Sequence, residues 1–251
     1  MKNREIYNFD YFTLNNYQKL LELAIVKNFW FISFTDDFVE ERKDVLWRHD
    51  VEFSPDIALK MAKMENALGI KATYFFQLHS EFYNILEQYF SNILVEIKSL
   101  GHFIGLHFDS HYYNIQKEKE LDEYISLDKE YFEKVFKIKL GVFSFHNTNP
   151  FILSCDKFRY GGLINVYSSF FKTKYNYCTD STGYWRYQIL DEVLKNPTVC
   201  HLQVLIHDAM WTEEVLSPRK RVMKSIQSNA ERIKRQYDQG LLLLGANNID
   251  E

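Results

Sequence analysis

The sequence predicts an α/β fold in which helices cover a mostly parallel β-sheet. Segments with the apolar spacing of helices alternate along the chain with short apolar runs of strand length, and such alternation favours strand–helix–strand crossovers. Hydrophobic residues make up 46% of the 251 residues, which is enough for a substantial core. With only four prolines and nine glycines, the chain shows no linker or composition break, so a single domain over 1–251 is expected.

The expected elements follow one another without an internal repeat. A first helix over 13–29 has Thr13 as a plausible N-cap, and the clearest helix, 54–69, combines a capping Ser54, Pro55 at its first position and a final Gly69. Further helices are expected within 81–101, at about 116–137 and over 217–240. Strands are expected over 30–34, 44–52, 71–77, 102–108, 140–146, 199–208 and near 175–181, in a region (150–185) that also mixes loops and a short helix.

Charge and cysteine content narrow the functional class. The net charge of -4 is spread along the chain and does not favour nucleic acid or an anionic membrane as the main partner. The odd set of three cysteines fits no disulfide or metal framework and is typical of free thiols in a reducing compartment. The first residues lack a signal-peptide core and no apolar run approaches ~18 residues, so a cytoplasmic protein without a transmembrane segment is expected. The sequence does not predict an oligomeric state.

Several expected strands end on titratable side chains. These are Asp50 with Glu52, then His107, His146 and His207. In parallel α/β folds the active site lies at the carboxyl ends of the strands. We therefore expect at least three of these groups to converge.

The strand expected over 44–52 ends on acidic residues, and the directions of its side chains can be predicted. Because side chains alternate between the faces of a strand, Arg48, Asp50 and Glu52 point the same way and His49 points the other way. Asp50 and Glu52 can thus reach one site, with Arg48 one layer beneath them. His49 is expected to be a structural histidine.

His107 is followed four residues later by His111. This spacing puts both imidazoles on one side if the chain turns into a loop or a first helical turn. Two imidazoles and one carboxylate form a common ligand set for a catalytic divalent metal. The alternative is a His-x-x-x-His that occurs by chance in a loop.

Five segments occur in an order that resembles a known family, the polysaccharide deacetylases with a NodB-homology domain (carbohydrate esterase family 4). The segments "RHDVE", "GHFIGLHFDSH" and "VLIHD" are specific, whereas "FSFHNTNP" and "TDSTGYW" are weaker matches. The resemblance spans roughly 45–208. It implies a distorted parallel (β/α) barrel, seven-stranded and NodB-like. Residues 1–43 would add a helix and a strand, 44–208 would form the motif-bearing core, and 209–251 would contribute a C-terminal helix and a last strand.

The resemblance also implies roles for individual residues. Glu52, His107 and His111 would hold a divalent metal, zinc in the first place and nickel or cobalt otherwise. Asp50 would be the general base and His207 would protonate the leaving amine.

Two departures from the family pattern accompany these roles. Glu52 stands where an aspartate is usual, and His146 or its neighbours stand where the third motif has an arginine. Arg48 could orient Asp50 in place of that arginine. Either Asp180 or Asp208 could keep His207 charged.

Four further residues are expected to lie near the substrate. Trp185 and Leu205 are expected to form walls of an acyl pocket, and Trp185 could equally be core. A backbone N–H near His146 would face the oxyanion, although His146 could also be a loop histidine. Tyr112 could stack on a sugar ring or simply pack against the protein.

These expectations favour one function over two alternatives. The first is a metal-dependent hydrolase that removes an N-acetyl or N-formyl group from an amino sugar in surface-glycan assembly, acting on a small-molecule or glycan substrate. The second is an amidohydrolase for a small non-sugar amide. The third is an inactive carbohydrate-binding relative, which the missing arginine favours and the intact Asp50, His107, His111 and His207 oppose.

Overall fold

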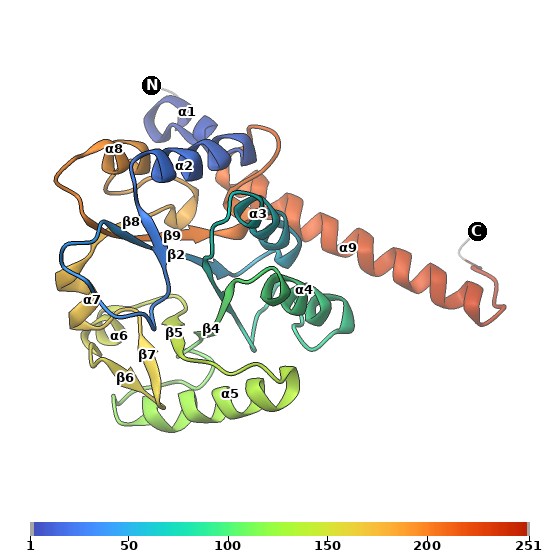
Figure 1. Cartoon of the computed structure of the whole chain (residues 1–251). Helices are drawn as coiled ribbons and strands as arrows, with labels where there is room; N and C mark the ends of the chain where they lie inside the picture. The colour runs from blue at the N-terminus through green and yellow to red at the C-terminus, as the bar shows by residue number, and fades with distance from the viewer. Residues whose placement is uncertain (1–2, 250–251) are drawn as a thin grey trace.

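The computed structural model describes residues 3–249, and it has the expected alternation of strands and helices (Figure 1). The strands are β1 (Trp30–Ile32), β2 (Asp44–Val51), β3 (Thr73–Phe76), β4 (Phe103–Phe108), β5 (Val142–Phe145), β6 (Arg159–Tyr160), β7 (Leu163–Asn165), β8 (Asn176–Thr179) and β9 (His201–His207). The α-helices are α1 (Asn3–Tyr7), α2 (Leu14–Val26), α3 (Pro55–Ala67), α4 (Gln88–Ser99), α5 (Glu120–Phe136), α6 (Pro150–Ser154), α7 (Ser169–Lys174), α8 (Leu190–Lys195) and α9 (Pro218–Leu243). Short 3-10 helices are η1 (Phe9–Tyr11), η2 (Ser181–Gly183) and η3 (Asp208–Met210).

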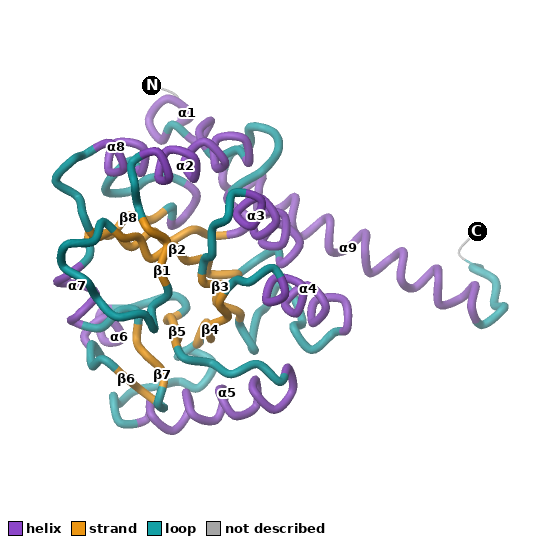
Figure 2. The backbone as a smooth tube through the Cα atoms, viewed as in Figure 1, coloured by secondary structure: helices purple, strands orange, loops and turns teal. Residues whose placement is uncertain are grey.

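The strands form one mostly parallel sheet, and Figure 2 shows that it is curled. Its order is β6-β7-β5-β4-β3-β2-β9-β8, and β1 and β3 share one edge of β2: β1 pairs with its first half and β3 with its second half. Every pairing is parallel except that of β6 with β7. The predicted class, a distorted parallel (β/α) barrel, is confirmed.

Within the described residues the sheet has nine strands, because a small hairpin adds β6 and β7 to the seven strands expected. Its turn consists of Gly161 and Gly162, both with positive φ (55° and 78°), between the paired Tyr160 and Leu163. Two glycines between short apolar segments are a signal for a tight hairpin turn, which the sequence analysis missed.

The predicted helix starts are formed by the expected caps. The Thr13 hydroxyl accepts the N–H of Asn16 at 3.3 Å, and the Ser54 hydroxyl accepts the N–H of Ile57 at 3.4 Å. Pro55 occupies the first helical position of α3, and Gly69 takes a left-handed φ of 74° just beyond its end. The end of β2, which precedes Ser54, is therefore fixed against the start of α3.

Side chains fill the sheet on both faces. The concave interior contains Leu46, Phe75, Val142 and Ile164, and a larger cluster lies beneath the helices. Close packing inside the curl explains Gly105 of β4: a Cβ at that position would lie 2.5 Å from the ring of Phe75 on the neighbouring strand. The glycine lets β3 and β4 pair while the ring occupies the interior.

The C-terminal helix is longer than expected and only partly covered. α9 begins at Pro218 as predicted and continues to Leu243, and Figure 1 shows it projecting away from the body. The last strand expected within 209–251 is absent as far as residue 249, and residues 1, 2, 250 and 251 of the expected domain lie outside the described residues. None of the helices within 3–249 is both long and apolar enough to cross a membrane.

Candidate active site

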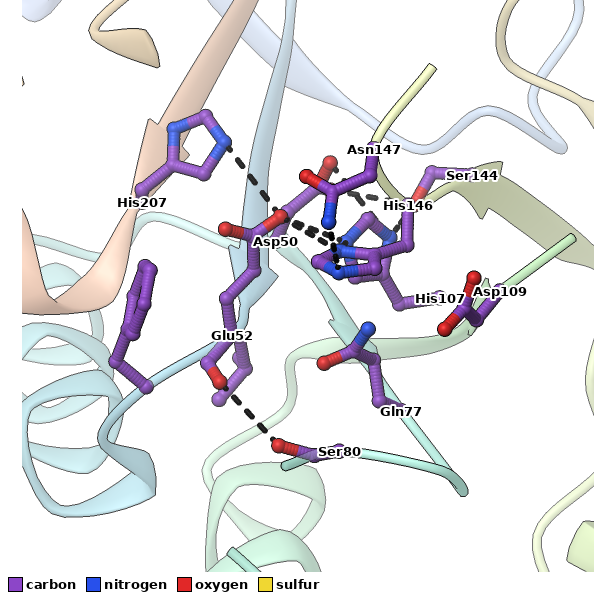
Figure 3. Close-up of polar contacts among 12 residues, drawn as sticks. Asp50, Glu52, Gln77, Ser80, His107, Asp109, Ser144, His146, Asn147 and His207 are labelled. Carbon is purple, nitrogen blue, oxygen red and sulfur yellow. Dashed lines mark hydrogen bonds and ion pairs between the residues drawn. The ribbon is translucent and has the colours of Figure 1, made fainter. Parts of the chain in front are cut away.

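The carboxyl ends of the central strands bring a carboxylate and two imidazoles together (Figure 3). Glu52 Oε1 lies 3.1 Å from His107 Nε2 and 2.9 Å from His146 Nδ1, and the two histidine nitrogens are 3.2 Å apart. These three residues come from the ends of β2, β4 and β5. Asp50 and His207 are register partners on β2 and β9, and His207 Nε2 is 4.0 Å from Glu52 Oε1. The convergence expected at the strand ends is therefore present.

A hydrogen-bonded chain fixes the tautomer of His107. The Ser144 hydroxyl donates to Asp50 Oδ1 at 3.3 Å, so its oxygen can accept the Nδ1–H of His107 at 2.7 Å. The lone pair of His107 Nε2 then points toward Glu52 and His146. An imidazole held through its other nitrogen in this way is typical of a metal ligand.

His111 is not part of this group of mutually close ligand atoms. Asp109 accepts the backbone N–H of His111 at 2.9 Å and lies 3.3 Å from its Nδ1, so the side chain turns outward and is 51% exposed. His146 is brought in because its N–H bonds to the carbonyl of Phe108 at 2.8 Å, beside the end of β4. The predicted set of Glu52, His107 and His111 thus differs from the set that the structure brings together, in which His146 is the third member.

Arg48 lies beneath Asp50, as the strand phase predicted. Its Nη2 donates to Asp50 Oδ2 at 3.1 Å, and both side chains are buried. The same nitrogen is 2.8 Å from the hydroxyl of Tyr167, and the guanidinium lies 4.8 Å from the centre of that ring. Tyr167, in the loop after β7, could not be identified from the sequence because its role depends on how the curled sheet closes.

His207 is held by a buried carboxylate, which a tryptophan holds in turn. Asp180 Oδ1 is 2.6 Å from His207 Nδ1, and Asp180 Oδ2 accepts Trp211 Nε1–H at 2.7 Å. Burial lowers the pKa of His207, but the charges of Glu52 and Asp180 raise it to about 10. The imidazole is therefore protonated at neutral pH, with Nε2–H directed into the site.

The sequence offered two acids, Asp180 and Asp208, as partners of His207, and the structure gives them different contacts. Asp180 contacts the imidazole, whereas Asp208 accepts the backbone N–H groups of Glu52 at 3.0 Å, Phe53 at 3.3 Å and Ser54. Burial raises the pKa of Asp208 to about 6 despite these donors. Asp208 thus anchors the turn that presents Glu52.

Burial raises the pKa of Glu52, but the charge of His207 and the neighbouring imidazoles of His107 and His146 lower it well below the ordinary glutamate value. Glu52 is therefore a carboxylate at neutral pH. A negative oxygen facing two imidazole nitrogens is a suitable donor set for a divalent cation.

The expected substrate-facing residues are spread around this centre. Trp185 packs against Phe12 and Trp211 at ring distances of 5.2 and 6.1 Å, so Trp211 rather than Trp185 supports the His207–Asp180 pair. Leu205 is buried in β9 opposite Arg48, one layer below the strand ends.

Tyr112 lies at the rim formed by the loop after β4. Its ring stacks on the imidazole of His79 at 3.7 Å and is 61% exposed. One aromatic face is therefore supported by the protein while much of the residue contacts solvent.

Comparison with known proteins gives structural neighbours only. No family model matches the chain, and no curated protein sequence is detectably similar to it. A family 4 carbohydrate esterase from Bacillus anthracis is 17% identical over 84% of each chain, with a TM-score of 0.45. The Xyl-CE4 domain of a multidomain xylanase from the hindgut metagenome of Trinervitermes trinervoides is 10% identical, over 82% of this chain and 93% of that domain, with a TM-score of 0.44. Both belong to the family whose motifs the sequence resembles.

Proposed function

We propose that this protein is a metal-dependent hydrolase that removes an N-acyl group, acetyl or formyl, from an amino-sugar intermediate of surface-glycan assembly. The observation that carries the proposal is the cluster of Glu52, His107 and His146, whose ligand atoms all lie within 4.8 Å of one another beside Asp50 and His207. A general base, a proton donor and a candidate metal site lie together at the carboxyl ends of the strands. These are the groups that catalysed amide hydrolysis requires.

The residues present fit a divalent cation. Two imidazole nitrogens and one carboxylate oxygen match catalytic zinc sites, and nickel or cobalt would accept the same donors. When bound by Glu52, His107 and His146, such an ion would polarise the amide carbonyl and make a water molecule more acidic.

Asp50 is the group that takes the proton of the attacking water. Its carboxylate is held by Arg48 on one oxygen and Ser144 on the other, so it does not need to reorganise during the reaction. Arg48 supplies the guanidinium contact that the absent third-motif arginine would otherwise make, which argues against an inactive relative.

His207 delivers a proton to the leaving nitrogen. As the water oxygen bonds to the acyl carbon, the C–N bond breaks and Nε2–H of His207 passes its proton to the amine. Asp180 holds the opposite nitrogen of the ring and stabilises the charged form before transfer. The exposed ring of Tyr112 would lie under the sugar.

The test is release of acetate or formate from N-acetylated and N-formylated amino sugars, both free and nucleotide-linked, by metal-reconstituted protein. Asp50→Asn should abolish release, whereas Asp191→Asn, a change of the same type on the surface of α8, should leave it intact. Turnover of small non-sugar amides alone would favour the second candidate function. No turnover of any amide by the metal-loaded protein would leave the carbohydrate-binding relative.

A further inference from the structure

A buried glutamine lies next to the candidate cation site. Gln77 follows β3 directly, and in the sheet β3 pairs with β2 on one side and with β4 on the other. The paired stretch of β3 ends at Phe76, so Gln77 reaches the level of Glu52, the residue after β2, and of His107 in β4. Figure 3 shows its carboxamide directed toward the group formed by Glu52, His107 and His146.

The backbone of Gln77 is fixed to the end of β2. Its N–H donates to the hydroxyl of Tyr83 at 3.1 Å, and that hydroxyl donates to the carbonyl of Val51 at 2.7 Å. Three residues after Gln77, the Ser80 hydroxyl donates to the carbonyl of Glu52 at 3.4 Å. Because the loop after β3 is held to the end of β2 at two points, the Gln77 side chain keeps its place beside the site before any ligand binds.

The carboxamide of Gln77 has no hydrogen-bond partner within residues 3–249, although only 3% of the residue is exposed. Buried side-chain amides in folded proteins are normally hydrogen-bonded, and an exception in a candidate active site points to a ligand that supplies the missing partner. A carboxamide offers two N–H donors and one oxygen acceptor. The ligand should therefore bring a polar atom to this position.

Several groups around Gln77 cannot donate a hydrogen bond to a substrate oxygen. Glu52 is a carboxylate and only accepts hydrogen bonds. The N–H of His146, near which the sequence placed an oxyanion contact, donates to the carbonyl of Phe108 at 2.8 Å. In the proposed reaction the Nε2–H of His207 passes to the leaving nitrogen. An N–H of the Gln77 carboxamide is free of such a commitment.

We propose that Gln77 binds the acyl oxygen of the substrate through a side-chain N–H, a role that rests on the proposed function. When water adds to the acyl carbon, the electron pair of the C=O bond moves onto this oxygen, which becomes negatively charged. Gln77 keeps its proton, and its hydrogen bond strengthens as the charge develops. A neutral donor that is already held in place stabilises such a charge without reorganisation. Gln77 is therefore a further catalytic residue of the proposed reaction.

Steady-state kinetics of metal-reconstituted variants test the role of Gln77 in turnover. Gln77→Met keeps the size of the side chain but removes its N–H groups, so kcat should fall by about 100- to 1,000-fold with little change in KM. Zinc content and circular dichroism should stay at wild-type values, which separates this role from metal binding and from folding. Gln203→Met is the matched control, because Gln203 is also buried (4% exposed) but lies opposite Leu46, well before the end of β9. A Gln77→Met enzyme with the kcat of Gln203→Met, or one that has lost its zinc, would overturn the proposal.

A binding measurement on the metal-free protein tests the contact without turnover. When the side-chain nitrogen of glutamine is labelled with nitrogen-15, the Gln77 signals in the NMR spectrum are those missing from the spectrum of Gln77→Met. N-acetylglucosamine should shift these signals, whereas glucosamine, which lacks the acyl group, should leave them in place. Unmoved signals, or equal shifts with both sugars, would overturn the proposal, because the acyl oxygen would then not be the atom that Gln77 binds.

The two measurements separate this contact from the proposed reaction. Shifted Gln77 signals in a protein that hydrolyses no amide would support the acyl-oxygen contact and refute the hydrolysis. Hydrolysis with an unchanged kcat in Gln77→Met would refute the role of Gln77 and leave the hydrolysis in place.

Discussion

Replacing Glu65, a buried residue outside the candidate active site, is expected to lower the free energy of unfolding. Glu65 lies on α3 and is completely buried against the convex face of the sheet. Its carboxylate accepts from the hydroxyls of Tyr17 and Tyr74 and is 2.6 Å from Nε2 of His49. Because His49 lies between Arg48 and Asp50 on β2, this network holds the strand that carries the proposed base.

The size of the effect follows from the donors left behind. Glu65→Ala leaves two phenols and one imidazole N–H buried without an acceptor, at about 1–3 kcal/mol each. The free energy of unfolding should therefore fall by about 3–9 kcal/mol, a large part of the ~5–15 kcal/mol typical of a domain. Glu65→Gln keeps one acceptor oxygen and should cost about 1–3 kcal/mol.

Urea denaturation followed by tryptophan fluorescence measures this loss, with an unchanged slope indicating that only stability has changed. A Glu65→Ala protein within about 1 kcal/mol of wild type would refute the reasoning, because three orphaned buried donors cost more than that.

The same residue predicts an acid dependence. Burial raises the pKa of Glu65, but His49 and the hydrogen-bond donors around it lower the pKa below the ordinary glutamate value. Its stabilising contribution is therefore complete above about pH 4.5 and is lost as the pH falls through the lower folded-state pKa. Glu65→Gln, which does not titrate, should show a shallower loss of stability over that interval.

Three further predictions concern the site itself. Asp180→Asn removes one of the carboxylates that raise the pKa of His207, so the alkaline limb of the kcat/KM profile should move to lower pH; an unmoved limb would contradict the assigned proton donor. Arg48→Ala should lower kcat by about 10- to 1,000-fold with little change in KM, because it removes an orienting contact to Asp50, and steady-state kinetics with unchanged turnover would exclude that role. Asp208→Ala leaves three backbone N–H groups without their acceptor and should cost about 3 kcal/mol or more in urea denaturation, whereas wild-type stability would mean that the turn is held by other contacts.

The sequence predicted the fold class and most strand ends because periodicity and strand phase are local properties. The alternation along β2 placed Arg48 with Asp50 and turned His49 to the opposite face, as the structure has it. The helix caps at Thr13 and Ser54 could also be predicted from the sequence, because each capping hydrogen bond joins residues three positions apart.

Other features depended on contacts between distant segments. His111 turns outward because its side chain lies against the nearby Asp109. His146 reaches Glu52 only because β5 pairs with β4. Trp211 likewise meets Asp180 through the fold of the chain after β9, and no spacing in the sequence marks that contact. Tertiary packing therefore determines which of several similar side chains reaches the candidate active site.

Metal content of matched variants tests the central claim most directly. Wild-type protein, His146→Ala and His111→Ala would be stripped of metal, offered zinc, dialysed and measured by elemental analysis. The site geometry predicts about one zinc per chain in the wild type and in His111→Ala, and a loss of zinc in His146→Ala. Loss of zinc in His111→Ala with retention in His146→Ala, or no bound zinc in any of the three proteins, would contradict the account.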